Sequence, residues 1–416
     1  MMWKRFWWVV SAGLIGATSP CWSADAPAKA GPAKEAEAKP IPARTRMYPT
    51  PTQPVWDASD GSYSRFWISS GTFHVLVDDL TGDGRQDLIF TTHSTGMIQV
   101  FRQVERRRFV AVGEQDIAGF HPNDTIALPG APKRYVINGE GDARLRVVSP
   151  QPDGRLTLVG DYATPGPLSS TPFSWPDWGL GLAVVPYSGS SLTLLRDFNP
   201  ETATAKATVT LTAGRDVRPA RLADIKGSGI PALVFPSFDD SKVWAAEYAG
   251  PDRDPTLTEL AAFPGGWPRH VLPLDVNRDG KVDLLVPMSV EQRIAVLLNG
   301  GQGKFNEGES IAYPGSPGIH AMAVGEDRCE RYLLAGGIRA LVLYRERRDK
   351  PGGFETVLLP LINWPSRLEL VDVDGDGWLD AVVASVGEAT SMVVYGPLWE
   401  AFGKLAANPP DGAKPD

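Results

Sequence analysis

The sequence contains little cysteine and no excess of positive charge. Only two of its 416 residues are cysteines, so disulfides cannot supply much of its stability. Its formal net charge is −8 at pH 7, which argues against a phosphate-rich partner, and we expect no nucleic-acid ligand. No apolar run is long enough for a membrane-spanning helix, so we also expect no transmembrane segment.

The first residues have the pattern of a secretory signal. Two basic residues, Lys4 and Arg5, precede an apolar run over residues 6–16, and small residues suited to cleavage follow. We therefore expect a signal peptide over residues 1–24 and a periplasmic or secreted protein. A lipid anchor at Cys21 is an alternative.

Two further segments are expected to lack fixed structure. Residues 25–55 are rich in alanine, proline and lysine and can bury little apolar surface, which predicts a disordered tether. Residues 404–416 are similar and predict a flexible tail. After export, Cys329 would have no partner for an intramolecular disulfide, so the folded part over residues 56–403 needs another source of stability.

The folded part contains one nine-residue pattern three times, over residues 79–87, 275–283 and 372–380. Oxygen-bearing side chains stand at positions 1, 3, 5 and 9, and glycine stands at position 6. Calcium takes six to eight oxygen ligands, and a tight loop with alternate inward side chains supplies them. The alternative is that these aspartates and glycines only form polar hairpin turns and bind no metal.

The segments beside these loops predict strands. They are apolar and β-branched, as in residues 74–77 before the first loop and residues 88–92 after it. An EF-hand would place glutamate at position 12 between helices, but position 12 here is Phe90, Val286 or Val383. The 43 glycines and 37 prolines also favour an all-β chain with many turns.

A repeat of roughly 50 residues contains the three loops. Numbering each repeat from position 1 of its loop gives starts at 79, 129, 183, 224, 275, 325 and 372, four of them degenerate. The first unit predicts strands at residues 74–77, 87–92, 97–102 and 108–113. Four antiparallel strands per repeat are typical of a β-propeller blade, so we predict an all-β, seven-bladed β-propeller. The last unit lacks a fourth strand, and residues 64–69 are predicted to close the ring by pairing with it.

From about residue 60 to 400 the chain resembles the FG-GAP/VCBS repeat family, which includes the integrin α-subunit propeller and many exported bacterial proteins. The resemblance is specific at the three Asp loops and weak in the other blades. It implies Ca²⁺ bound between the first and second strands of a blade, but no single activity. The implied ligands are Asp79, Thr81, Asp83, Arg85 (carbonyl) and Asp87; Asp275, Asn277, Asp279, Lys281 (carbonyl) and Asp283; and Asp372, Asp374, Asp376, Trp378 (carbonyl) and Asp380.

Departures from the family pattern predict differences between loops. Thr81 replaces a usual carboxylate, so the first site should bind calcium more weakly. The fourth unit has Lys226 at position 3 and Ala232 at position 9, so no calcium site is expected there. The Lys226 ammonium is either a partial replacement for the ion beside Asp224 or an ordinary solvated lysine.

The first strand of each propeller blade lines the central channel, and its start opens on the face opposite the loops. Histidine, arginine and tryptophan recur about five residues before the loops. This pattern suits an acidic glycan, because sugar rings stack on tryptophan and carboxylates pair with arginine. The alternatives are a metal bound by three histidines, structural packing, or docking of a partner protein. The candidate ligand-binding residues are His74, His270, His320, Arg367, Arg269, Arg218 and Trp178.

Catalysis has little support, because no nucleophile elbow, zinc-protease motif or phosphate loop occurs. The prediction is a monomeric binding or scaffold module that carries calcium. The alternative is an enzyme on the same scaffold, such as a polysaccharide lyase, with its base among the residues at the channel mouth.

Overall fold

The computed structural model describes residues 55–408 apart from 70, 252, 316–317, 329, 361–363 and 387–389. All of these residues belong to one compact unit, residues 44–416. The predicted signal peptide, the lipid-anchor position Cys21, nearly all of the tether and Cys329 lie outside the described residues.

Seven separate antiparallel sheets make up this unit, and each is one predicted repeat. In blades 1 to 3 the strands follow one another in sequence order. Blade 1 contains β3 (Thr72–Asp78), β4 (Asp87–Thr92), β5 (Met97–Glu105) and β6 (Arg108–Gln115); blade 2 contains β7 (Pro122–Leu128), β8 (Arg134–Gly139), β9 (Arg144–Pro150) and β10 (Leu156–Ala163); blade 3 contains β11 (Pro167–Trp175), β12 (Gly179–Pro186), β13 (Ser191–Arg196) and β14 (Ala207–Thr212).

Blades 4 to 6 repeat this order, and blade 7 combines both ends of the described chain. Blade 4 contains β15 (Arg221–Ala223), β16 (Ala232–Ser237), β17 (Lys242–Glu247) and β18 (Thr256–Ala262); blade 5 contains β19 (Leu272–Leu274), β20 (Asp283–Pro287), β21 (Arg293–Asn299), β22 (Phe305–Glu307) and β23 (Ile311–Ala312); blade 6 contains β24 (Ala321–Asp327), β25 (Glu330–Gly337), β26 (Ala340–Arg347) and β27 (Lys350–Pro360); blade 7 contains β28 (Pro365–Val371), β29 (Asp380–Ser385), β30 (Thr390–Val394), β2 (Tyr63–Trp67) and β1 (Val55–Asp57).

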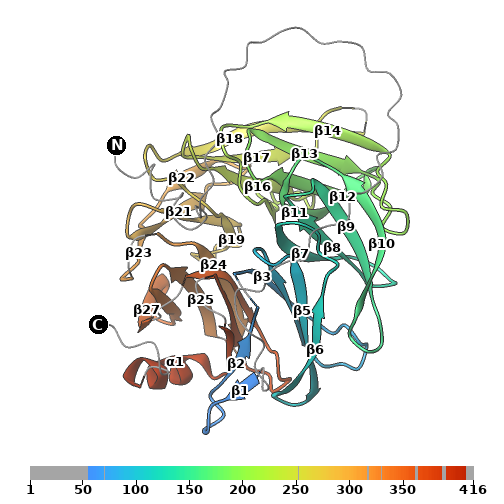
Figure 1. Ribbon diagram of the computed structural model, residues 1–416. Helices are drawn as coiled ribbons and strands as arrows, with labels where there is room; N and C mark the ends of the chain where they lie inside the picture. Colours follow the sequence, from blue (N-terminus) through green and yellow to red (C-terminus); the bar gives the residue numbers. More distant parts are fainter. Residues whose placement is uncertain are drawn as a thin grey trace, which may run out of the picture. The chain divides into compact units, whose positions relative to one another are not determined.

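The first strands of the blades gather at the centre of a ring (Figure 1). Contacts join β28 to β3, β3 to β7, and β24 to β28 around this centre. The chain is therefore a seven-bladed β-propeller, as the sequence predicts. The turns that join first to second strands define one face, which we call the Asp-loop face. The turns that join second to third strands define the opposite face.

The ring closes between blade 7 and the N-terminal strands. Strand β2 pairs antiparallel with β30, from Tyr63 opposite Val394 to Trp67 opposite Thr390. This pairing confirms the predicted closure and covers an edge that would otherwise expose unpaired backbone groups. Strand β1 then pairs with β2 and extends the blade to five strands.

The hydrophobic core lies between neighbouring blades. The second strands are buried along their whole length, as in β4, β16 and β29, because each blade is covered on both faces by its neighbours. This double burial explains why the sequences of these strands are apolar without alternation. In the cluster at the closure, Phe66 from β2 packs with Phe90 and Phe101 of blade 1 and with Val382 of blade 7.

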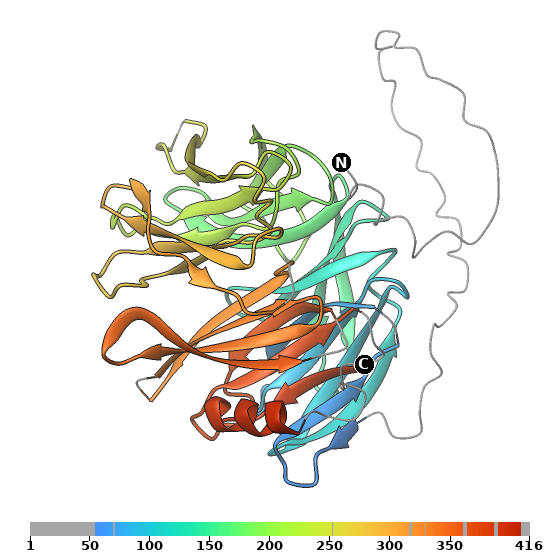
Figure 2. The ribbon, with the colours of Figure 1, turned by 90° about the vertical axis from the view of Figure 1, so that its left-hand side faces the viewer.

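Two elements differ from the expected arrangement. The repeat start at 183 lies inside β12, the second strand of blade 3, because residues 167–175 form its first strand. Helix α1 (Leu398–Ala407) crosses the predicted boundary at residue 403 and packs against β27 (Figure 2). Its buried residues Leu398, Phe402 and Leu405 repeat at helical spacing. None of the helices in the described part is long and apolar enough to cross a membrane.

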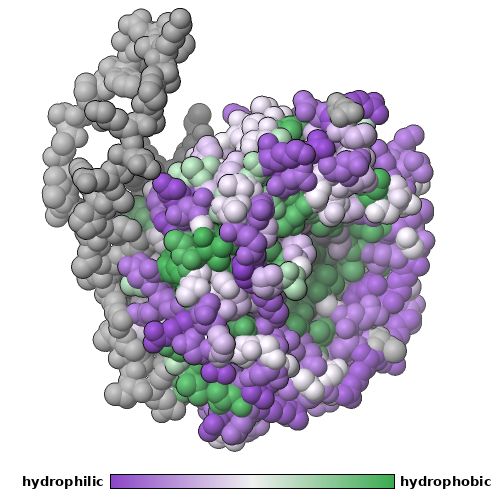
Figure 3. Space-filling model, turned by 90° about the vertical axis from the view of Figure 1, so that its right-hand side faces the viewer, coloured by the Kyte–Doolittle hydropathy of each residue, from purple (hydrophilic) through white to green (hydrophobic). Residues whose placement is uncertain are grey.

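On the side drawn in Figure 3 the surface is mainly hydrophilic, with several apolar patches, one of which lies in a recess. A cleft of about 680 Å³ lies between β6 and the turn that joins β9 to β10. Val112, Glu114, Gln115 and Leu156 are among its lining residues. This cleft is separate from the Asp loops and from the central channel.

A substitution at the ring closure tests the fold directly. Phe66 has no exposed surface, and its ring lies 5.1 Å from that of Phe101 and 5.2 Å from that of Phe109. We expect Phe66→Ala to lower the free energy of unfolding by about 3–5 kcal/mol, measured by urea denaturation. Trp56→Ala on β1, where the side chain is 37% exposed, is the control and should cost less than about 1 kcal/mol. Equal losses would contradict the assigned closure.

Candidate functional site

The three Asp loops share one backbone conformation. Glycine at position 6 has a positive φ in each, 83° at Gly84, 83° at Gly280 and 82° at Gly377. Position 4 also has a positive φ, even in the second loop, where it is the non-glycine residue Arg278 at 59°. Glycine adopts these angles without steric cost. The repeated glycine at position 6 therefore has a conformational reason.

The aspartate at position 1 organises each loop through backbone N–H groups. The Asp372 carboxylate accepts hydrogen bonds from Gly375, Asp376 and Gly377 at 2.8–3.1 Å. Asp79 and Asp275 make corresponding bonds in their own loops. These bonds hold the loop in a tight turn around its first carboxylate.

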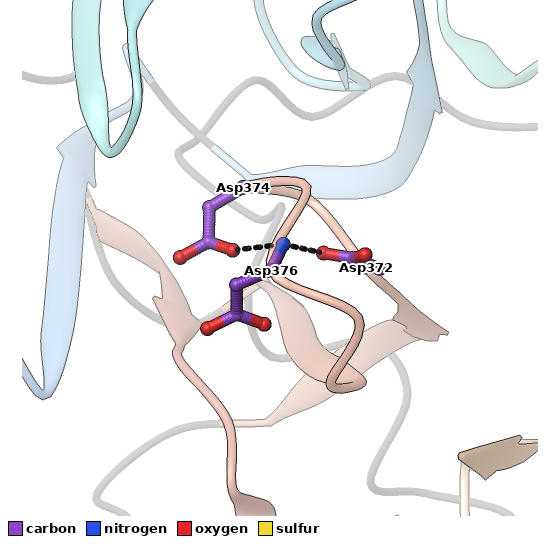
Figure 4. A group of neighbouring side chains, drawn as sticks. All are labelled: Asp372, Asp374 and Asp376. Carbon is purple, nitrogen blue, oxygen red and sulfur yellow. Dashed lines mark hydrogen bonds between the residues drawn. The ribbon is translucent and has the colours of Figure 1, made fainter. Parts of the chain in front are cut away.

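The third loop brings three carboxylates together. Oxygen atoms of Asp372, Asp374 and Asp376 all lie within 4.8 Å of one another, and this is the one such group among the described residues. Figure 4 shows the three side chains around the turn. The Asp374 and Asp372 carboxylates both accept the N–H of Asp376. Carboxylates this close repel one another unless a cation lies between or beside them.

The aspartate at position 9 has a different environment, because it is fully buried in all three loops. Asp87 accepts the N–H groups of Leu80 at 3.1 Å and Gln103 at 2.9 Å. Asp283 and Asp380 make the same pair of bonds, to position 2 and to the end of the third strand. Burial raises the pKa of Asp87 to about 6 and that of Asp380 to about 7.

Arginines from a neighbouring blade contact the third loop. Arg107 Nε lies against Asp374 Oδ2, and Arg106 Nη2 lies 2.7 Å from Asp376 Oδ2. Both arginines come from the β5–β6 turn of blade 1, which the sequence analysis did not assign to the site. They already supply positive charge to this loop, so they would weaken its attraction for a metal ion.

The loop residues fit a calcium ion by their donor chemistry. The third loop supplies a cluster of carboxylates, and oxygen-only ligands are what calcium requires. In the first loop the Thr81 hydroxyl oxygen is buried and has no hydrogen-bond partner in the described structure. An unpaired buried oxygen at position 3 is one that an ion can satisfy. The second loop places the Asn277 side-chain oxygen at the same position, where it accepts the N–H of Asp279.

The degenerate fourth loop keeps the turn without the ligands. Gly227 and Gly229 have positive φ values, and Asp224 accepts the N–H groups of Ser228 and Gly229. Lys226 forms an ion pair with Glu247 on β17, at 2.5 Å. The ammonium therefore has a carboxylate partner other than Asp224, which does not support its role as a replacement for the ion.

Two of the predicted ligand-binding residues meet on the opposite face. The guanidinium carbons of Arg218 and Arg269 lie 5.1 Å and 4.4 Å from the centre of the same Phe238 ring. Asp216 pairs with Arg218, and Trp267 lies 5.8 Å from Phe238. We call these residues the mouth cluster.

The mouth cluster combines two guanidinium groups with an accessible ring. Burial and the neighbouring Arg218 charge lower the pKa of Arg269 to about 10. Trp267 is 36% exposed, and Tyr187, 42% exposed, interacts electrostatically with both arginines. Sequence reasoning missed Asp216, Phe238 and Tyr187, because they come from connections whose spacing to the loops is irregular.

Other predicted residues lie deeper in the channel. Burial, with the nearby charges of Arg367 and Arg221, holds the pKa of His74 well below its usual range. Burial likewise lowers the pKa of His270 and that of His320 to about 3. His270 Nε2 contacts the carbonyl oxygen of His320. The three histidines are thus neutral near pH 7, and they do not form a metal-ligand group in the described structure.

Trp178 is not at the channel mouth, so its assignment there is wrong. It lies in the turn between β11 and β12, at the end of the blade that carries the Asp loops in other blades. Its side chain is 2% exposed and packs 5.2 Å from the Trp175 ring. The cause is the misplaced start of the third repeat, which shifted every position in that blade.

Comparison with known proteins identifies the fold only. No protein-family model and no curated protein matches the sequence. Solved structures do match. BBS1N, crystallised in complex with ARL6DN, has a TM-score of 0.55 and 12% identity, and the match covers 79% of this chain and 94% of that chain in mercury-soaked crystals. An inactive virginiamycin B lyase from Staphylococcus aureus, with quinupristin, has a TM-score of 0.55 and 12% identity, covering 80% and 99%.

The channel contains a buried acid whose titration is testable. Burial raises the pKa of Asp124 to about 7, although Ser169 and Asn138 donate to its carboxylate and Arg367 and Arg221 are nearby. The folded state therefore holds a proton that the unfolded chain loses near the ordinary aspartate pKa of 3.8. Stability should fall as the pH rises from about 4 to about 7.

We expect Asp124→Asn to reduce this fall, because asparagine does not titrate. The free energy of unfolding of Asp124→Asn, relative to the wild-type protein, should rise with pH. The total rise should be roughly 1.4 kcal/mol for each unit by which the pKa of Asp124 is raised. Urea denaturation at a series of pH values measures it, and Asp153→Asn, at an exposed turn, is the control. Parallel pH profiles for the wild-type protein and Asp124→Asn would contradict the assignment.

Proposed function

We propose that this protein is an exported, calcium-stabilised propeller of the FG-GAP/VCBS type that binds an acidic glycan at its channel mouth. The observation that carries the ligand proposal is the mouth cluster, in which Arg218 and Arg269 share the Phe238 ring and Arg218 pairs with Asp216. The Asp loops support the calcium proposal, and the basic and apolar N-terminal segment supports export to the periplasm or the medium.

Calcium would have a structural role in this proposal. The ligands would be the side-chain oxygens at positions 1, 3, 5 and 9 and the carbonyl at position 7. A bound divalent ion would neutralise carboxylates that otherwise repel one another in the third loop. After export Cys329 would have no disulfide partner, so metal binding would be a further source of stability.

The mouth cluster suits a ligand that has a carboxylate beside a flat, weakly polar surface. Arginine binds carboxylates in two-point geometry, and stacking on an exposed indole orients a sugar ring. A uronate unit has both features. The cluster gathers two guanidinium groups around Phe238 in a protein that is acidic overall.

The lyase alternative is less well supported than binding. A general base works best when its pKa is near the working pH. Burial holds the pKa of His270 and that of His320 near 3, so neither is matched to proton abstraction at neutral pH. Docking of a partner protein at the same face is the remaining alternative, and BBS1N is a propeller of similar fold that was crystallised in a protein complex.

Removing calcium should destabilise the protein. A site filled at one hundred times its dissociation constant adds about 2.7 kcal/mol, so EGTA should lower the melting temperature by several degrees. Asp372→Ala should reduce this calcium-dependent shift. The matched control is Asp224→Ala, which removes position 1 from the loop without ligands and should leave the shift unchanged. A wild-type melt that is identical in EGTA and in calcium would refute structural calcium.

The ligand proposal predicts binding of trigalacturonate, measured by calorimetry. Arg218→Gln and Arg269→Gln should each weaken binding roughly tenfold, or by about 1.4 kcal/mol, through loss of a charged contact. Trp267→Ala should also weaken it. Methyl-esterified trigalacturonate, which has no charge, should bind poorly.

The matched control is Arg339→Gln, an exposed arginine in a turn of the same face. It should bind trigalacturonate as the wild-type protein does. Equal affinity in all variants would refute the mouth site. New ultraviolet absorbance during the titration would show elimination and establish a lyase instead.

A further inference from the structure

We propose that His93 and His121 form a further metal site, on the face opposite the Asp loops, which binds a divalent transition ion such as Zn²⁺ and links blade 1 to blade 2. His93 lies in the turn between β4 and β5, and His121 directly precedes β7. We call these two residues the histidine pair. The inference goes beyond the proposed function, because it requires neither calcium in the Asp loops nor a glycan at the mouth.

A direct ring contact joins the two residues of the histidine pair. The imidazole centroids of His93 and His121 lie 4.6 Å apart, with an angle of 41° between the ring planes. Two imidazoles on one zinc ion have centroids roughly 5 Å apart, because each zinc–nitrogen bond is about 2.0–2.1 Å long. The observed separation is close to this value, so small rotations of the two rings would aim a nitrogen of each at one ion.

Two phenylalanines pack against the histidine pair from outside. Phe73 of β3 stacks on His93 with centroids 4.4 Å apart, and Phe120 stacks on His121 with centroids 4.0 Å apart. The Glu140 N–H donates to the His121 carbonyl oxygen, at 3.1 Å, and holds this end of the stack against blade 2. The imidazoles are therefore positioned by packing before any ion binds, which reduces the entropy lost on binding.

His93 is held with one nitrogen suited to a metal. Its Nδ1 atom lies 3.2 Å from the carbonyl oxygen of Pro122, which can only accept a hydrogen bond, so Nδ1 carries the proton and Nε2 keeps its lone pair. Metal-binding histidines commonly donate their second nitrogen to a backbone carbonyl in this way. Burial, with a smaller effect of His121, lowers the pKa of His93 to about 4, so the ring is neutral near pH 7 as metal binding requires.

His121 has an unusual backbone conformation. Its φ is 48°, in the left-handed region that residues with a side chain rarely adopt. Backbone strain of this kind gathers at binding sites. Here it accompanies the contact between the His121 and His93 rings. A bound ion that needs both rings would offset the strain.

The ligand chemistry of the histidine pair favours zinc over calcium. Imidazole nitrogen suits zinc, copper and nickel, whereas calcium takes oxygen ligands. Among the described residues, the third Asp loop is the one group of three or more His, Cys, Asp or Glu ligands. Water would therefore complete the zinc shell beside the two imidazoles. Phe120 is 47% exposed, and Ser94, next to His93, is also exposed, so solvent reaches this part of the surface.

The test is a calorimetric titration of the full protein with zinc chloride in excess calcium, which competes for oxygen ligands. We expect one zinc ion per chain. His93→Phe and His121→Phe should each weaken zinc binding at least about tenfold. Phenylalanine keeps a flat ring in the stack but supplies no nitrogen, so this loss would report on coordination rather than on packing.

A spectroscopic measurement identifies the ligands directly. Copper binds nitrogen sites more tightly than zinc does. Electron paramagnetic resonance of bound Cu²⁺ should show coupling to two imidazole nitrogens in the wild-type protein and to one in each phenylalanine variant. Circular dichroism checks that each variant is folded.

The matched control is Ser94→Ala, which changes an exposed residue of the same turn and should bind zinc as the wild-type protein does. Three results would overturn the proposal. They are no zinc binding by the wild-type protein, unchanged binding in both phenylalanine variants, and loss of zinc as calcium rises, which would place the zinc in an Asp loop. A protein that binds neither calcium nor trigalacturonate would leave these expectations intact.

Discussion

The buried aspartate at position 9 is the contact on which the Asp-loop face depends. In blade 5, Asp283 accepts N–H groups from Val276 and Asn299, which ties the loop to the end of the third strand. The Asn299 side chain then donates to the carbonyl of Ile225 in blade 4, at 2.9 Å. Asp283 thus fixes its own blade and positions an amide that binds the preceding blade.

The joint between blade 1 and blade 7 has the same arrangement, formed by different residues. Gln103, whose N–H is held by Asp87, donates its side chain to the carbonyl of Val373 in blade 7, at 2.8 Å. Arg107, from the adjacent turn, contacts Asp374 and lies over the Tyr395 ring, at 4.4 Å. The third Asp loop is therefore part of the joint between the last blade and the first. An ion bound there would act on ring closure as well as on one turn.

The sequence predicts the parts of this fold that repeat locally. The Asp loops are predicted from residue spacing, and the strands beside them and the closing strand from apolar segments. Each of these signals lies within one short stretch of sequence. Blade 3 has no Asp loop, so its start was misplaced and Trp178 was assigned to the wrong end. Contacts between blades, such as those of Arg106 and Phe238, have no local signal, since their partners are set by the closed ring.

The propeller separates two electrostatic environments in one acidic chain. Carboxylates gather on the Asp-loop face, while Arg218 and Arg269 lie at the channel mouth. The central claim is that cations belong to the first environment and anions to the second. Metal analysis of protein purified in calcium and freed of unbound ions tests it most directly. The account predicts bound calcium that falls when Asp372 is replaced by alanine, and protein without bound calcium would contradict it.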